Sequence, residues 1–207
     1  SILRKDLMKI LTQRAVELGI KIHYQHNVIA ISDHDNDKTT VQFSNGTRIT
    51  PDIIIGADGR MKSYAREYVN GDNTPIYQGF INWIGVVDFK TEAFSELSVS
   101  DYWGIGERFG IVPISKNTAY WAGGAAAQQL GDINPAEYKS ELLSLFSQWP
   151  DPITQVINET PQSRINKIYV HDHNPINKWH KNNIVLVRPV KNLRYRLKKT
   201  FKRNFVV

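Results

Sequence analysis

The segment PDIIIGADGRMKSYAREYV, residues 51–69, decides how the rest of the chain is interpreted. It is typical of a short buried strand over Ile53–Ile55, a tight turn over Gly56–Gly59 and a helix over Met61–Val69. The two glycines let the backbone turn sharply or approach a ligand closely. Ligands of open α/β sheets bind beyond the carboxyl ends of the strands, so we expect Asp58 to face such a crevice. The alternative is that Asp58 only caps the helix, and the turn alone leaves both interpretations open.

The same residues carry a family resemblance. Gly56-Ala57-Asp58-Gly59-Arg60, followed by Ser63 and Arg66, resembles the Gly-Ala-Asp-Gly-x-x-Ser-x-x-Arg segment of FAD-dependent aromatic hydroxylases. These are the para-hydroxybenzoate hydroxylase-like flavoprotein monooxygenases, in which the Asp-Gly pair lies near the flavin pyrophosphate and is linked to nicotinamide-cofactor use. The resemblance implies FAD as cofactor and NAD(P)H as co-substrate. It also implies that Asp58, Gly59 and Arg66 belong to the cofactor site, with Arg66 supporting the turn.

The first helix adds a fourth cofactor residue. Residues 2–18 show apolar positions at helical spacing, and Gly19 stands where a glycine often ends a helix. By itself, Arg4 is more typical of a solvated helix arginine than of a phosphate ligand. However, Leu3-Arg4-Lys5-Asp6-Leu7 resembles the Arg-x-x-Leu-x-x-x-Leu segment of the same family, whose arginine contacts the flavin nucleotide. The resemblance implies that role for Arg4.

Composition limits the class of protein. The chain has 207 residues, of which 41% are hydrophobic and 22% charged, as in ordinary globular proteins. The sequence shows no apolar run long enough to span a bilayer and no signal peptide. Cysteine is absent, which fits a reducing compartment, and we expect a cytoplasmic protein.

The net charge of +6 arises from the basic residues of the last twenty positions. Eight of the 26 Lys and Arg residues lie in 188–207, which has no acid, so the other residues carry 18 basic against 20 acidic groups. We expect segment 188–207 to be a disordered basic tail. Its mixture of cations and aromatics leaves open an alternative function, binding to nucleic acid or another anionic surface. The slightly acidic remainder argues against this alternative.

Residues 20–50 are typical of β-structure, including an alternating segment Ile20–Tyr24 and an Asn45-Gly46 hairpin turn. From Tyr77 to Trp121 the chain is rich in aromatics and resembles the family's substrate-binding sheet. We predict a substrate pocket lined by Trp83, Tyr102, Pro113 and Trp121. The alternative for each aromatic is packing in the sheet and core, since aromatics favour strands in any case.

The later segments follow the order of the same family. Helices are predicted over 135–149 and 150–158, and strands over 165–170 and 184–187. Asp172, Pro175 and Trp179 match the family's Asp, Pro and Trp before a buried strand. The histidines are irregularly spaced, so we predict no metal site. After Val187, the family's Gly-Asp-Ala-Ala-His does not follow, and its opening G-x-G-x-x-G is not found in the chain. We therefore expect an incomplete member of the family.

Together these observations predict an α/β (α+β) chain. Residues 1–74 would form a partial FAD/NAD(P)-binding Rossmann-like domain, and residues 75–176 a mixed β-sheet substrate domain with covering helices. Residues 177–187 would form a strand that returns to the FAD domain. The expected function is a fragment of an FAD- and NAD(P)H-dependent monooxygenase acting on a small aromatic or cyclic organic substrate. No catalytic side chain is assigned, because the flavin carries the chemistry in this family. A related flavin oxidoreductase acting on a lipid-like substrate and an inactive remnant remain alternatives.

Overall fold

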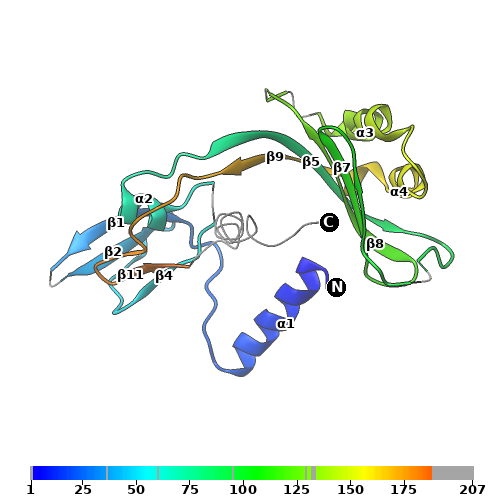
Figure 1. Cartoon of the computed structure of the whole chain (residues 1–207). Coiled ribbons are helices and arrows are strands. Elements are labelled where there is room, and N and C mark those ends of the chain that lie inside the picture. Colours follow the sequence, from blue (N-terminus) through cyan, green and yellow to red (C-terminus); the bar gives the residue numbers. More distant parts are fainter. Residues whose placement is uncertain are drawn as a thin grey trace, which may run out of the picture. The chain divides into compact units, whose positions relative to one another are not determined.

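The computed structural model describes residues 2–35, 37–59, 61–94, 96–128, 130–131 and 134–187. The predicted basic tail, 188–207, therefore lies outside the described residues. The described residues divide into two compact units, one within 2–21 and 77–171 and one within 22–76 and 172–187. We describe each unit separately (Figure 1). The predicted domain bounds remain a prediction, and they differ from these units chiefly in where they place residues 1–21.

The first unit is built on a five-stranded sheet with the strand order β6-β7-β8-β5-β9. Helices α3 and α4 cover one face of this sheet (Figure 1). The strands are β5 (Ile76–Asp88), β6 (Ser100–Trp103), β7 (Glu107–Pro113), β8 (Thr118–Ala126) and β9 (Asn166–Asp172). The helices are α3 (Tyr138–Phe146) and α4 (Ile153–Glu159), with 3-10 turns η1 (Pro135–Glu137) and η2 (Gln162–Arg164).

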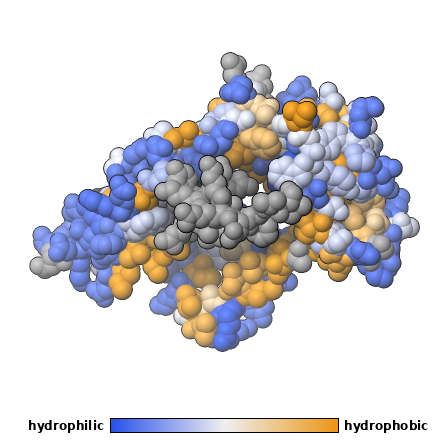
Figure 2. Space-filling view, in the orientation of Figure 1, coloured by the Kyte–Doolittle hydropathy of each residue, from blue (hydrophilic) through white to orange (hydrophobic). Residues whose placement is uncertain are grey.

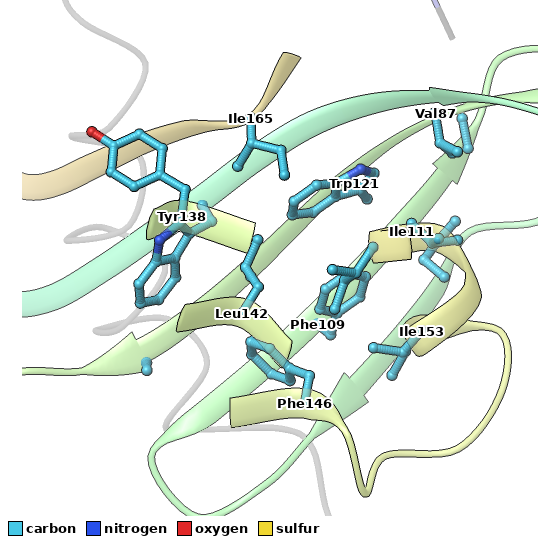
Figure 3. Packing of buried hydrophobic residues seen from close by; sticks show 14 of the residues in the cluster. Val87, Phe109, Ile111, Trp121, Tyr138, Leu142, Phe146, Ile153 and Ile165 are labelled. Atoms are coloured by element: carbon cyan, nitrogen blue, oxygen red, sulfur yellow. The ribbon is translucent and has the colours of Figure 1, made fainter. Parts of the chain in front are cut away.

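The core of this unit lies between the sheet and the two helices (Figure 3). The rings of Phe109 and Trp121 stack with their centroids 5.4 Å apart, and Phe146 meets Phe109 edge-on at 5.2 Å. All three side chains have no exposed surface. Burial of this much aromatic area is the main stabilising contribution to the unit.

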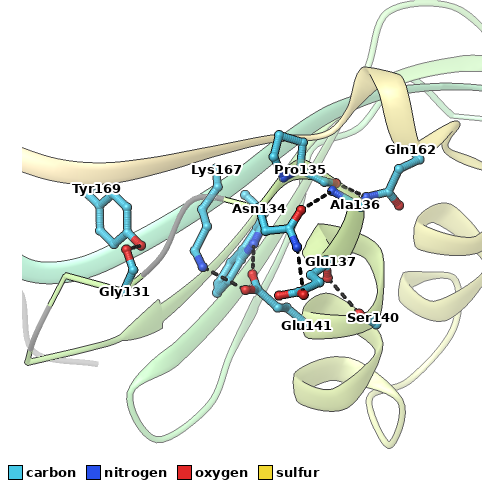
Figure 4. Close-up of polar contacts among 11 residues, drawn as sticks. Gly131, Asn134, Pro135, Ala136, Glu137, Ser140, Glu141, Gln162, Lys167 and Tyr169 are labelled. Atoms are coloured by element: carbon cyan, nitrogen blue, oxygen red, sulfur yellow. Dashed lines mark hydrogen bonds and ion pairs between the residues drawn. The ribbon is translucent and has the colours of Figure 1, made fainter.

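A polar contact joins helix α3 to strand β9 beside this core (Figure 4). The ammonium of Lys167 lies 2.9 Å from Glu141 Oε1, and the indole of Trp83 donates to Glu141 Oε2 at 2.9 Å. The Lys167 side chain is only 6% exposed. Burial by itself would lower the pKa of Lys167, but the hydrogen bond and charge of Glu141 outweigh it and raise the pKa.

Helix α1 (Arg4–Glu17) forms where the sequence predicts it, and Gly19 follows with φ +71°. None of its residues is buried, although it carries the expected apolar positions. Leu7, Ile10 and Leu11 are each 42–55% exposed. Figure 2 shows hydrophobic colour over the area that α1 occupies in Figure 1.

The second unit contains two small sheets and one helix. Strands β1 (Val28–His34), β2 (Lys38–Phe43) and β3 (Arg48–Ile49) form an antiparallel sheet. Strands β10 (His180–Lys181), β11 (Ile184–Leu186) and β4 (Ile54–Gly56) form another, in which β11 runs parallel to β4. Helix α2 (Tyr64–Asn70) packs on the second sheet through Ala65 and Val69, against Ile184 and Leu186.

Three predicted elements differ from the structure. The strand predicted as buried over Ile53–Ile55 runs from Ile54 to Gly56, and Ile53 and Ile55 are 70% and 68% exposed, because of the three isoleucines only Ile54 packs against the core of this unit. The segment Ile20–Tyr24 is not a strand, since no described strand pairs with it and its apolar side chains are exposed. Helix α2 begins at Tyr64 rather than Met61, because Ser63 caps it. The predicted fold class, a mixture of helices with parallel and antiparallel strands, is confirmed. No helix among the described residues is long and apolar enough to cross a membrane.

Candidate functional site

The turn after β4 is fixed by a close approach of strand and helix. A Cβ added to Gly56 would lie 2.5 Å from the Cβ of Ala65 and 3.0 Å from Cδ2 of Leu186, so only glycine fits. Gly59 has φ +88°, a conformation that favours glycine, and nothing lies within 4 Å of where its Cβ would be. Gly56 is thus required for the packing of β4 against α2, whereas at Gly59 no described side chain covers this side of the main chain.

Asp58 holds the start of helix α2. The hydroxyl of Ser63 donates to Asp58 Oδ1 at 2.5 Å, and the main-chain N–H of Ala65 donates to Asp58 Oδ2 at 3.1 Å. Ser63 in turn accepts from the N–H of Arg66 at 2.9 Å, which makes it the N-cap. Both carboxylate oxygens of Asp58 therefore bind within the turn and helix, as the capping alternative predicts. Asp58 nevertheless remains exposed.

The spacing of this segment departs by one residue from the family pattern to which the sequence was compared. Three residues, 60–62, separate Gly59 from Ser63, whereas the pattern Gly-Ala-Asp-Gly-x-x-Ser has two. The hydrogen bond from Ser63 to Asp58 shows that the extra residue does not break the cap.

Arg66 contacts the turn through its main chain, while its side chain extends toward another segment. Its Nη2 donates to the carbonyl of Asn174 at 2.9 Å. Its Nε is buried, and no described residue accepts a hydrogen bond from it. Burial lowers the pKa of the Arg66 guanidinium, while the charges of Asp72 and Asp172 oppose that effect.

Of the four predicted cofactor residues, the structure places Asp58 and Gly59 together in the turn, whereas the side chain of Arg66 is directed to Asn174. Asp58, Gly59 and Arg66 lie within one strand-turn-helix segment of the second unit. Arg4, the fourth, is the exposed first residue of α1 and belongs to the first unit. Its role stays a prediction.

The four predicted pocket residues lie on the core side of the large sheet. Trp121 has no exposed surface and donates to Thr160 Oγ1 at 2.9 Å, and Trp83 is 3% exposed. Tyr102 is half-buried against the same core, and Pro113 is the buried last residue of β7. For the two tryptophans the structure shows the packing alternative, because their rings are enclosed by the core.

The opposite face of this sheet holds residues that the sequence analysis did not single out. Strand register places Asn82 and Arg108 on either side of Gly124, and Val86 beside Tyr120. These side chains are half-buried, and burial raises the pKa of Tyr120. The period-two alternation of β5, with bulky residues on both faces, was the signal that could have identified this face.

Arg108 forms a compact polar group on that face. Its Nε and Nη2 bind the two carboxylate oxygens of Asp101 at 2.8 and 3.0 Å. Its guanidinium also lies over the ring of Trp103, 5.1 Å from the centroid, and Trp103 is 75% exposed. The fork geometry and the aromatic contact hold the arginine in one orientation.

Among the described residues, the side-chain types that commonly bind metal ions are histidine, aspartate and glutamate. No group of three His, Asp or Glu residues lies close enough together there to hold a metal ion. The sequence contains no cysteine.

Comparison with known protein families gives one match that covers most of the chain. The family model described as FAD binding domain matches residues 2–187. Aurachin C monooxygenase/isomerase of Stigmatella aurantiaca is 36% identical over 151 residues, which cover 73% of this chain and 39% of that protein. The FAD-dependent urate hydroxylase of Klebsiella pneumoniae is 27% identical, with 75% of this chain and 40% of that protein covered. The chain thus spans about two fifths of the length of these relatives.

Solved structures show the same fold. Klebsiella pneumoniae HpxO, crystallised with FAD and uric acid, superposes with a TM-score of 0.71 at 24% identity. That match covers 78% of this chain and 41% of the HpxO chain. A putative FAD-containing monooxygenase from Photorhabdus luminescens gives a TM-score of 0.74 at 16% identity, covering 90% of this chain and 55% of that one.

Proposed function

Because this chain belongs to the FAD binding domain family, we propose that it forms part of an FAD- and NAD(P)H-dependent monooxygenase. Its substrate would be a small aromatic or cyclic organic molecule. The observation that carries the proposal is the Gly56–Gly59 turn, held at the end of a strand and capped onto α2. Bound FAD would supply the redox chemistry, with NAD(P)H as reductant and molecular oxygen as the source of the inserted oxygen atom.

We assign different tasks to the residues of the turn. Asp58 and Ser63 are positioning residues, since their side chains bind one another and the start of α2. Gly59 is the residue whose main chain would lie against the cofactor, because its positive φ and the open space beside it suit a close approach. Arg4 would address the flavin phosphates, which its charge and exposure at the start of α1 allow.

The half-buried face of the large sheet is our candidate for the substrate side. Asn82 and Tyr120 offer hydrogen-bonding groups among apolar neighbours such as Ile84 and Val86, the mixture that small-molecule sites use. Arg108 adds a fixed cation paired with Asp101. These groups would orient a flat substrate and exclude water from its reacting edge.

FAD binding is the first test. We expect titration of the full chain with FAD to give the perturbed absorption spectrum of bound flavin. The Gly59→Ala variant should weaken this binding, whereas Gly46→Ala should not. Gly46 is a matched control because its φ is +84° and its Cβ position is also open, so both variants carry similar backbone strain, on the order of 1–2 kcal/mol. Absence of any bound-flavin spectrum, or equal loss in both variants, would overturn the assignment.

Turnover is the second test. NADH or NADPH oxidation would be followed in the presence of FAD, oxygen and a panel of aromatic and cyclic compounds, with ¹⁸O₂ as the label. We expect the label in a product and a faster rate with one nicotinamide cofactor. Uncoupled oxidation without labelled product for every compound would contradict the proposed substrate class. A cytoplasmic location, expected from the cysteine-free sequence, stays a prediction.

A further inference from the structure

A pocket of about 340 Å³ lies between the end of helix α2 and the segment before β10. Both walls belong to the second unit. The pocket is distinct from the Asp58 turn, none of whose residues lines it. Its lining residues are Arg66, Val69, Asn70, Asp72, His173, Asn174, Pro175, Ile176, Asn177 and Lys178.

The guanidinium of Arg66 is held in this wall by a hydrogen bond from Nη2, and its buried Nε–H is unused by the described residues. Its Nη2 is bound to the carbonyl of Asn174 at 2.9 Å, which sets the plane of the group. The buried Nε–H finds no acceptor among the described residues. A buried donor without an acceptor is destabilising, so such a group in a pocket wall suits an acceptor from outside the chain.

The charges around the pocket favour an anion over a cation. Arg66 and Lys178 are positive, and Asp72 is the acidic residue of the lining. The carboxylate of Asp72 is already bound by the N–H of Thr74 at 2.9 Å and its hydroxyl at 2.7 Å, and these bonds lower the pKa of Asp72. Asp172 also acts on Arg66, but it accepts from the N–H of His173 and is not part of the lining. The lining therefore keeps a net positive charge, and its three asparagines, Asn70, Asn174 and Asn177, add neutral polar groups.

We propose that this pocket binds an oxyanion of the phosphate or carboxylate class, held by the Nε–H of Arg66 and the ammonium of Lys178. Arginine presents paired donors that match such groups, and lysine supplies a mobile positive charge. This site does not depend on flavin binding, so its test and the test of the proposed function can give different outcomes.

The test observes the unused donor directly. The full chain, ¹⁵N-labelled, would be titrated with inorganic phosphate at constant ionic strength while the arginine Nε–H resonances are followed. We expect one resonance, assigned to Arg66 by its loss in Arg66→Lys, to move to saturation. Lys178→Gln should raise the apparent Kd by roughly tenfold, the usual size of one charge-assisted hydrogen bond. Lys116→Gln is the matched control, since Lys116 pairs with Glu92 in the other unit.

Parallel titrations separate the possible sources of the oxyanion. Acetate distinguishes a carboxylate from a phosphate, and NADP⁺ against NAD⁺ distinguishes a phosphate carried on a nucleotide from a free one. The site is supported if any of these compounds saturates the shift of the Arg66 resonance and binds more weakly to Lys178→Gln. An Arg66 Nε–H resonance that stays fixed in all of them, or that chloride shifts equally, would overturn it. If Lys178→Gln and wild type bind phosphate with equal affinity, Lys178 does not hold the oxyanion and the proposed site is wrong.

Discussion

Gly56 in strand β4 and Ala65 in helix α2 approach so closely that a Cβ on Gly56 would lie 2.5 Å from the Cβ of Ala65. Real Cβ atoms do not come this near, so the two small residues set the distance between strand and helix. The Asp58 turn spans the same strand and helix, and its cap geometry depends on that distance.

We predict that Gly56→Ala destabilises the protein by about 1–3 kcal/mol, the usual cost of overpacking a core. Urea unfolding would measure the change. Gly131→Ala is the control, because its nearest neighbour, the Tyr169 hydroxyl, lies at an ordinary contact distance of 3.5 Å. The double variant Gly56→Ala/Ala65→Gly should recover part of the loss. A Gly56→Ala protein as stable as wild type would show that the close approach does not limit packing.

Ser63→Ala should lower the free energy of unfolding by about 1 kcal/mol, since it removes the N-cap of α2. The N–H of Arg66 then loses its acceptor and Asp58 Oδ1 loses a donor. Ser140→Ala provides the comparison, because the exposed Ser140 only donates to the carbonyl of Glu137 within its own helix region. Equal effects of the two substitutions would argue against a capping role for Ser63.

The Lys167–Glu141 pair should respond asymmetrically to substitution. Glu141→Gln leaves the buried ammonium without its counter-charge, at a cost of about 3 kcal/mol. Lys167→Met fills the same space without a charge and leaves Glu141 accepting from Trp83, so it should cost less. Chemical denaturation of both variants checks the order, and a larger loss in Lys167→Met would contradict the account.

Asp88 should make stability depend on acid pH. Its carboxylate accepts from Arg164 and from Thr118 at 2.8 Å, and these bonds hold its pKa below the usual value. A depressed folded-state pKa adds stability above the unfolded pKa, about 3.9, which is lost as pH falls through the folded pKa. Asp88→Asn should therefore cost up to about 1 kcal/mol at pH 7, because the pair is half exposed, and nothing once the wild-type carboxylate is protonated. Thermal unfolding at pH 7 and at acid pH measures the stability difference between Asp88→Asn and wild type, with Glu92→Gln as the exposed control. A stability difference that does not change with pH would show that the pKa of Asp88 is not linked to folding.

Thr160→Val should destabilise the core by about 1–3 kcal/mol, because the buried indole N–H of Trp121 loses its acceptor. The variant should leave FAD binding unchanged if Trp121 acts only in the core. Guanidinium unfolding and flavin titration of the same preparation answer both points. Weakened FAD binding with unchanged stability would reassign Trp121 to a ligand site.

The strand-turn-helix segment could be predicted from sequence because each part has a local cause. The isoleucines of 53–55 favour a strand, and the glycines are needed for packing and for a positive φ. The sequence offers capping as an alternative role for Asp58, but it does not identify Ser63 as the N-cap, and the predicted helix therefore begins three residues before α2.

Other features depend on tertiary contacts that no local pattern encodes. Asn82 and Tyr120 each precede a core tryptophan, Trp83 or Trp121, by one residue and therefore point to the opposite face of the sheet. An error of one residue in the predicted register would exchange the core face and the outer face. The alternation of Ile20–Tyr24 resembled a strand but has no described strand to pair with. The pocket at Arg66 joins helix α2 to a segment more than a hundred residues later, as its hydrogen bond to Asn174 shows.

The parallel pairing of β4 with β11 has a consequence for biosynthesis. Ile54 and Ile55 leave the ribosome long before Ile184 and Val185, which lie opposite them on the neighbouring strand, and the whole large sheet is translated in between. The large sheet can thus fold before β11 has been synthesised, and β4 remains unpaired until then, since contacts distant in sequence form late. We expect a chain that ends at residue 183, released from the ribosome, to show a protease-resistant sheet and a protease-sensitive Ile54–Gly56 segment.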